Sequence, residues 1–114
     1  MNDCIFCNIA TGQLKADVVF EDQHVMAFRD LHPQAPIHIL IVPKIHIERV
    51  AALTDKTMHV VGEIHRAAQR IAQQNNVLEK GFRLITNSGP DAGQTVNHLH
   101  YHFLAGQLMS WRPA

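Results

Sequence analysis

Apolar and polar residues alternate most regularly near the end of the chain, between Val96 and Leu104. A period of two is typical of a half-buried strand, in which successive side chains point to opposite faces of the sheet. The polar positions include His98, His100 and His102, so the three imidazoles would share one face. The pattern therefore predicts a strand that carries a row of histidines in register.

Four shorter apolar runs also predict strands, because each is bounded by turn-forming residues or by proline. The first two are joined by a turn at residues 21–23, and the third is a continuous apolar run that Pro43 ends. The predicted strands are Val18 to Phe20, Val25 to Phe28, Ile37 to Val42 and Phe82 to Asn87.

Helical spacing of apolar residues predicts one long helix, from a cap at Thr54 to about Asn75. Leu53 and Met58 lie on either side of that cap, where a hydrophobic staple forms. The apolar face of the helix, which we expect in the core, consists of Met58, Val61, Ile64, Ala68, Ile71 and Ala72.

The strands and helices do not alternate in βαβ units, which favours an antiparallel α+β fold. The chain has 114 residues, so we expect a single domain over residues 1–114. Its formal net charge is zero, which implies no strong attraction to nucleic acid or to an anionic membrane. It shows no bilayer-length apolar stretch and no signal peptide, so we expect a cytoplasmic protein without a disulfide.

The row of histidines has three possible interpretations. An imidazole is a nucleophile, a proton carrier and a metal ligand near neutral pH. A solvated strand face would explain one histidine, but it explains three in strict register poorly. Three ligands for one ion would be too far apart, since alternate residues of a strand are about 6.6 Å apart. We therefore interpret the row as catalytic.

Cys4 and Cys7 form a second candidate site, within a short helix predicted from Cys4 to Ala10, capped by Asp3 and stopped by Gly12. Side chains at positions i and i+3 lie on one helix face, so both sulfurs can bind one ion. His46 and His98 could complete a tetrahedral zinc site. A redox pair would normally follow a strand, and two inert thiols remain the alternative.

A loop of small residues, Asn87 to Thr95, directly precedes the histidines. Small residues let backbone N–H groups approach an anion closely, and Gly93 and Thr95 are placed to meet a phosphate. An ordinary turn is the alternative. The histidines favour the phosphate, because phosphoryl chemistry needs both hydrogen-bond donors and a nucleophile.

The segment Gly93 to Leu104, GQTVNHLHYHFL, resembles the histidine triad (HIT) motif, His-φ-His-φ-His-φ-φ, in which φ is hydrophobic. Similarity to this family extends to CIFC at residues 4–7, AFRD at 27–30 and PQAPIH at 33–38. The ending AGQLMSW at 105–111 resembles the Hint branch, the purine nucleoside phosphoramidases. The Fhit branch of dinucleoside polyphosphate hydrolases carries Pro-Arg after the triad, and this chain does not.

The resemblance implies a HIT-like fold with a five-stranded antiparallel sheet and one long and one short helix per protomer. It also implies a homodimer that joins two sheets. The implied activity is hydrolysis of a purine nucleoside phosphoramidate, through a nucleotidyl-histidine intermediate and without a metal in the chemical step.

The resemblance also implies roles for individual residues. By motif position, His100 is the nucleophile, His102 contacts the phosphate and helps the leaving group, and His38 faces the same site. Asp30 would accept the ribose hydroxyls. The phosphate-binding positions would be Asn87, Gly93 and Thr95, the last also part of the catalytic set, and Gln94 would be a further nucleotide-binding residue. The purine slot would be lined by Ile5, Phe6, Ile9, Phe28 and Leu31, for which a plain core position is an equally good interpretation.

Some HIT proteins bind a structural zinc through two cysteines, a histidine after a Pro-Lys segment and the first triad histidine. The matching residues here are Cys4, Cys7, His46 and His98. The chain departs from the Hint pattern at Ala105, where glycine is usual, and at Asn97, where an aromatic residue is common. The remaining alternatives are a dinucleoside polyphosphate hydrolase, a nucleotidyl transferase, or a nucleotide-binding or scaffolding protein with vestigial catalysis.

Overall fold

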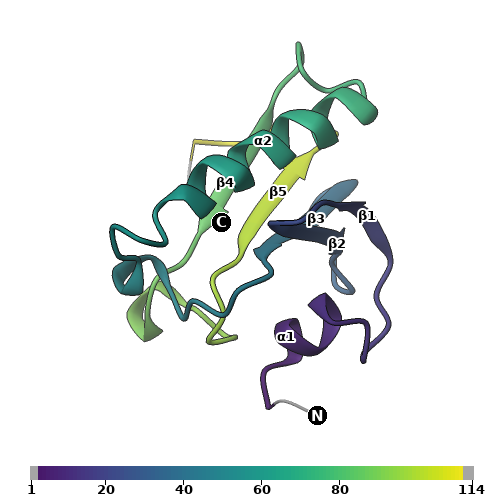
Figure 1. Cartoon of the computed structure of the whole chain (residues 1–114). Coiled ribbons are helices and arrows are strands. Elements are labelled where there is room, and N and C mark those ends of the chain that lie inside the picture. The colour runs from purple at the N-terminus through teal and green to yellow at the C-terminus, as the bar shows by residue number, and fades with distance from the viewer. Residues whose placement is uncertain (1–2, 112–114) are drawn as a thin grey trace.

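A computed structural model describes residues 3–111 and contains one antiparallel sheet of five strands in the order β1-β2-β3-β5-β4 (Figure 1). The strands are β1 Val18–Glu21, β2 Val25–Arg29, β3 Ile37–Pro43, β4 Phe82–Thr86 and β5 Tyr101–Ala105. The helices are α1 Ile5–Ala10 and α2 His59–Gln74, with short 3-10 turns at Val50–Ala52 and Pro90–Ala92. The predicted α+β class, the antiparallel sheet and the pair of unequal helices are confirmed.

Both faces of the central strand β3 are buried, which explains its continuous apolar sequence. Ile39 and Ile41 pack in the larger core under α2, whereas Leu40 and Val42 pack in a smaller cluster with Phe6 of α1. The two helices therefore cover opposite faces of the sheet (Figure 1). Neither helix within residues 3–111 is long and apolar enough to cross a membrane.

The predicted start of the long helix is wrong. Residues 54–57 form a separate turn, in which the Thr54 N–H donates to Thr57 Oγ1 at 2.9 Å, and α2 begins at His59. Met58 precedes α2 and is 50% exposed, so it does not hold the position inside the first turn that a staple needs, and Val61 is only half-buried. The buried face of α2 consists of Val60, Ile64, Ala67, Ala68, Ile71 and Ala72.

The predicted cap of the short helix is also wrong. The Cys4 sulfur caps α1 by accepting a hydrogen bond from the Cys7 N–H at 3.4 Å, whereas Asp3 lies outside the helix. The predicted stop is correct, because α1 ends at Ala10 and Gly12 has a φ of 82°.

The histidine strand is shorter than predicted, since pairing with β3 and β4 begins only at Tyr101. Before it, the chain is held by the Leu99 N–H, which donates to the Ile47 carbonyl at 2.6 Å. The alternation of side chains persists all the same. Leu99 and Phe103 pack in the core under α2, whereas His98 and His100 contact the Phe6 ring on the α1 side. Strand β4 likewise ends at Thr86, one residue before the predicted end.

Leu99 should be a main support of the histidine segment, because its side chain is 1% exposed in a stretch without sheet pairing. We expect Leu99→Ala to lower the free energy of unfolding by about 2–5 kcal/mol through the cavity that it leaves. The control, Leu31→Ala, truncates a side chain that is 89% exposed. It should change the free energy by less than about 0.5 kcal/mol. Urea unfolding measures both, and equal losses would contradict the assignment.

Candidate active site and zinc site

The four predicted metal ligands come together at one end of the histidine segment. The ligand atoms of Cys4, Cys7, His46 and His98 all lie within 4.8 Å of one another. His98 Nδ1 is 3.3 Å from Cys4 Sγ and 3.5 Å from Cys7 Sγ, and His46 Nδ1 is 3.3 Å from Cys7 Sγ. Nitrogen and sulfur ligands of a tetrahedral zinc are about 3.6 Å apart, so this spacing suits the ion.

The hydrogen bonding of His98 also suits a metal. Its Nε2 donates to the Pro43 carbonyl at 2.8 Å, and a neutral imidazole carries only one proton. Nδ1 therefore keeps its lone pair, directed at the two sulfurs. Burial lowers the pKa of His98 and so favours this neutral form.

The thiols show what a cation would contribute. Burial, a hydrogen bond with Cys4 and the charge of Cys4 raise the pKa of Cys7 to about 11. Two neighbouring thiolates are therefore unfavourable by themselves, and a divalent cation between them would reverse that balance. Two thiolates and two neutral imidazoles make a complete structural zinc set, with no position left for substrate.

His100 is buried between the zinc ligands and the last histidine of the triad. Its side chain is 5% exposed, and its ring lies 5.2 Å from the Phe6 ring and 5.3 Å from the His102 ring. Its Nδ1 donates to the His98 carbonyl at 2.8 Å. The neutral ring therefore has its unprotonated nitrogen at Nε2, as a nucleophile requires.

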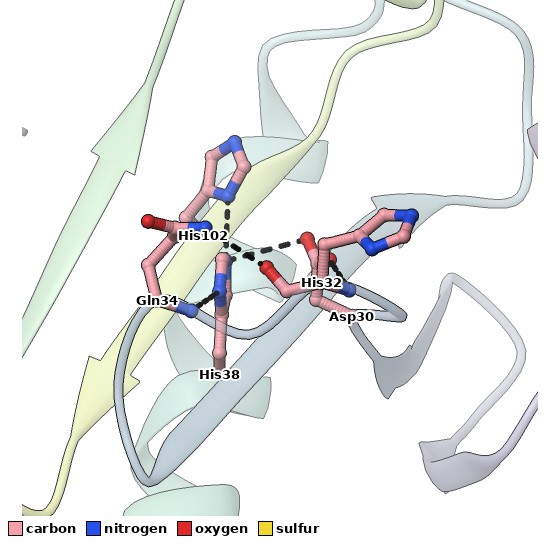
Figure 2. Close-up of polar contacts among 5 residues, drawn as sticks. All are labelled: Asp30, His32, Gln34, His38 and His102. Atoms are coloured by element: carbon pink, nitrogen blue, oxygen red, sulfur yellow. Dashed lines mark hydrogen bonds and ion pairs between the residues drawn. The ribbon is translucent and has the colours of Figure 1, made fainter.

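His102 is paired with His38 of the neighbouring strand (Figure 2). His38 Nε2 lies 2.9 Å from His102 Nδ1 and 3.4 Å from Asp30 Oδ2. Burial lowers the pKa of both histidines, and the charged forms of His100 and His38 lower that of His102 further. The negative charge of Asp30 opposes both shifts without cancelling them. These shifts favour the neutral form of both rings.

The predicted phosphate loop is held together by Gln94. Its side-chain oxygen accepts from the Gly89 N–H at 2.8 Å, and its Nε2 donates to the carbonyls of Glu48 and Val96 at 2.6 and 2.9 Å. Gly89 and Gly93 have positive φ values of 93° and 82°, which explains the glycines in this loop. The Gln94 side chain is thus engaged with the backbone around it.

The other predicted binding residues differ in burial and in contacts. Phe6, Ile9 and Phe28 are buried in the smaller core cluster, whereas Ile5 and Leu31 are 46% and 89% exposed. Thr95 lines a hollow beside Cys4 and His46. Asp30 is already engaged, because its Oδ1 accepts from the His32 N–H at 2.7 Å. In the loop, Asn87 is half-buried and Gly93 is exposed.

Several contacts that orient the histidine rings cannot be found by searching the sequence for residue types. Pro43 and His98 act through backbone carbonyls, and Gln34 acts through its backbone N–H. Thr86 of β4 makes another such contact, because its hydroxyl donates to the His100 carbonyl at 2.8 Å. This residue could have been suspected from the sequence. Its signal was its place at the end of a strand that pairs with the histidine strand.

Comparison with known proteins agrees with this geometry. Residues 11–109 match the HIT domain. The 14 kDa zinc-binding protein of Zea mays is 40% identical over 111 residues, covering 96% of this chain and 86% of its own.

Two solved structures were also compared. A HIT family hydrolase from Legionella pneumophila is 43% identical, with a TM-score of 0.95 over 98% of this chain and 100% of its own. A histidine triad nucleotide-binding protein from Candida albicans is 25% identical, with a TM-score of 0.81 over 98% of this chain and 85% of its own. The sequence match, the fold and the triad lead to one conclusion: this chain belongs to the HIT family, and its Cys/His cluster is consistent with a structural zinc.

Proposed function

We propose that this protein hydrolyses purine nucleoside 5'-phosphoramidates to the nucleoside monophosphate and an amine, through a nucleotide bound covalently to His100. The observation that carries the proposal is the Nδ1 hydrogen bond of His100 to the His98 carbonyl, which leaves Nε2 free to attack. The hydrolase and nucleotide-binding names of the two solved relatives support it.

In the first step, His100 Nε2 attacks phosphorus and forms a P–N bond as the bond to the amine breaks. Negative charge grows on the equatorial phosphate oxygens and needs fixed hydrogen-bond donors nearby. His102 is adjacent to His100, with ring centroids 5.3 Å apart, and is suited to that task. The phosphate-loop residues Asn87, Gly93 and Thr95 are the other candidate donors.

An amine leaves readily only when it carries a proton, so the site needs an acid. We assign the proton transfer to His102, whose ring stands next to the nucleophile. Water then attacks phosphorus, breaks the bond to His100 and returns a proton to His102. Each turnover consumes one water and restores both histidines. A zinc held by Cys4, Cys7, His46 and His98 would supply rigidity alone.

The nucleoside would lie against the exposed side chains of Ile5 and Leu31, with its ribose near Asp30. An open surface with apolar side chains suits a flat base. The Asp30 carboxylate retains lone pairs for ribose hydroxyls beyond its contacts with His32 and His38.

The alternatives are separated by one substrate panel. Adenosine 5'-phosphoramidate, diadenosine triphosphate and AMP would be tested with the same preparation, with and without chelator. Faster hydrolysis of the phosphoramidate supports the proposal, whereas faster hydrolysis of the dinucleotide would assign the other branch. Binding of AMP without turnover of either substrate would indicate a binding or scaffolding protein. A dependence on added metal would indicate a metalloenzyme.

A homodimer is part of the proposal, because β4 is an edge strand of the sheet and leaves a ladder of backbone groups for a partner. Beyond β5 the chain presents Leu108 and Trp111, which are 100% and 94% exposed. The Arg83 guanidinium of β4 donates to the Ser110 carbonyl at 2.5 Å and holds this tail beside the edge. The rest of the tail, residues 112–114, lies outside the described residues.

His100→Ala should lower turnover of adenosine phosphoramidate by several orders of magnitude, because no other group can take over the covalent step. AMP affinity should stay within about threefold, since the hydrogen-bond donors remain. Mass spectrometry of protein quenched in alkaline denaturant, in which a P–N bond to histidine survives, should detect the adenylated form only while His100 is present. His59→Ala, at an exposed position on α2, is the matched control. Turnover by His100→Ala near the wild-type rate would refute the nucleophile.

Replacing Cys4 and Cys7 with Ser should remove zinc and lower the melting temperature, because the metal joins three separate segments of the chain. Activity should fall about 10–100-fold, as for other losses of supporting contacts. Metal analysis of protein purified without chelator gives the test. Wild-type protein with less than about a tenth of an equivalent would contradict a closed four-ligand site.

Deleting residues 108–114 should change the preference among leaving-group amines more than it changes AMP affinity, if the exposed tail reaches the partner's site. Steady-state kinetics with a series of AMP amidates measures the first quantity, and calorimetry with AMP measures the second. Sedimentation of the full chain at micromolar concentration tests the dimer, and a monomer would rule it out.

A further inference from the structure

Two imidazoles beside the nucleophile form a chain of hydrogen bonds that starts at the backbone. The Gln34 N–H lies 3.0 Å from His38 Nδ1, and His38 Nε2 lies 2.9 Å from His102 Nδ1 (Figure 2). The other nitrogen of the His102 ring points away from His38 (Figure 2). The first contact has only one possible direction, because a backbone N–H donates and never accepts.

That direction determines which ring nitrogen carries the proton at each step from Gln34 to His102. His38 Nδ1 must accept from Gln34, so the single proton of the neutral ring lies on Nε2. His38 Nε2 must then donate to an unprotonated His102 Nδ1, since two N–H groups could not face each other at 2.9 Å. His102 in turn carries its own proton on Nε2.

We propose that the backbone N–H of Gln34 is a positioning group that, through His38, holds His102 in the tautomer with a proton on Nε2. This inference rests on the proposed function for its catalytic meaning, because that proton is the one offered to the phosphate or the departing amine. His102 Nε2 gives the proton to the amine nitrogen as the P–N bond breaks. The negative charge left on the His102 ring is balanced by the positive charge that His100 gains on bonding to phosphorus. Attacking water then returns a proton to His102 as His100 leaves as a neutral ring. These proton positions require both the His38 ring and the His102 ring to be neutral, and burial favours their neutral forms.

The same proton positions argue against a metal bound by Asp30, His38 and His102. The ligand atoms of Asp30, His38 and His102 lie within 4.8 Å of one another, as for a metal site. A ligating nitrogen needs a free lone pair, however, and His38 Nε2 carries a proton while Nδ1 accepts from Gln34. Binding would require loss of that hydrogen bond or formation of an imidazolate.

The loop that carries Gln34 is fixed on both sides. The Gln34 side chain donates to the His32 carbonyl at 3.1 Å, and the His32 N–H is held by Asp30. On the other side, a Cβ added at Gly106 would lie 3.0 Å from Pro36, so the loop packs closely against the end of β5. The donor is thus held in place rather than free to turn away.

Nuclear magnetic resonance of protein labelled with ¹⁵N-histidine tests the tautomers without any substrate. We expect unprotonated Nδ1 and protonated Nε2 in His38 and His102, and the opposite arrangement in His100. A protonated Nδ1 in neutral His38 or His102 would overturn the inference. Because no turnover is measured, this result is independent of the proposed function.

Gln34→Pro removes the N–H, whereas Gln34→Ala keeps it and loses only the side-chain bond. The labelled spectrum of Gln34→Pro, compared with that of Gln34→Ala, shows whether the fold and the tautomer survive. A folded Gln34→Pro protein that keeps the His38 Nε2–H tautomer as the sole neutral form would overturn the inference.

The catalytic part is tested with two substrates, the AMP amidate of an alkylamine and adenosine 5'-(4-nitrophenyl phosphate), whose leaving group needs no proton. We expect Gln34→Pro to lower kcat for the amidate by about 10²-fold, the lower end for loss of acid catalysis, and for the ester by less than about threefold. Gln34→Ala should change neither by more than about threefold. Equal losses on both substrates would show displacement of the loop and overturn the inference. Absence of amidate hydrolysis by wild-type protein would instead refute the proposed function.

Discussion

A neutral imidazole carries one proton for two nitrogens, and this constraint organises the whole site. Whichever nitrogen meets a fixed partner decides what the other can do. In His98 and His100 the fixed partner is a carbonyl, which leaves a lone pair on the remaining nitrogen. In His38 it is an N–H, which leaves a proton on the remaining nitrogen. One residue type can therefore present a lone pair at two positions and a proton at a third.

The sheet provides those fixed partners because β3 and β5 are neighbours. Strand β3 contributes His38 near its start and the Pro43 carbonyl at its end, and the histidine segment runs antiparallel beside it. The zinc cluster and the His38–His102 pair thus lie toward opposite ends of the same strand, with His100 between them. Leu99 and Phe103 anchor the opposite side of the segment in the core, so the imidazoles face α1 as a group.

The sequence predicts the fold class well, because long apolar patterns reflect burial on a large scale. Element ends are predicted less well, since they depend on local competition. Thr54 has the chemistry of a helix cap, but its N–H bonds Thr57 and closes a separate turn. A period of two reports where side chains point but not whether the backbone has a partner, so residues before Tyr101 look like strand without being paired.

In the candidate site, too, some features are predictable from the sequence and others are not. Its histidines and cysteines are recognisable from their spacing, and the structure brings all four metal ligands together. The contacts that fix their tautomers come from main-chain atoms of Pro43, His98 and Gln34, which every sequence possesses and no pattern marks. Only the path of the chain in space shows which carbonyl or N–H meets a ring.

The carbonyl of His98 has a consequence for how this protein can change over time. Because a main-chain oxygen, not a side chain, orients His100, any amino acid at position 98 would retain that hydrogen-bond acceptor. The metal ligand at this position can be lost by a single substitution, whereas the acceptor cannot. The side chain at position 98 and the orientation of the His100 ring can therefore change separately among descendants of this chain, although one residue contributes to both.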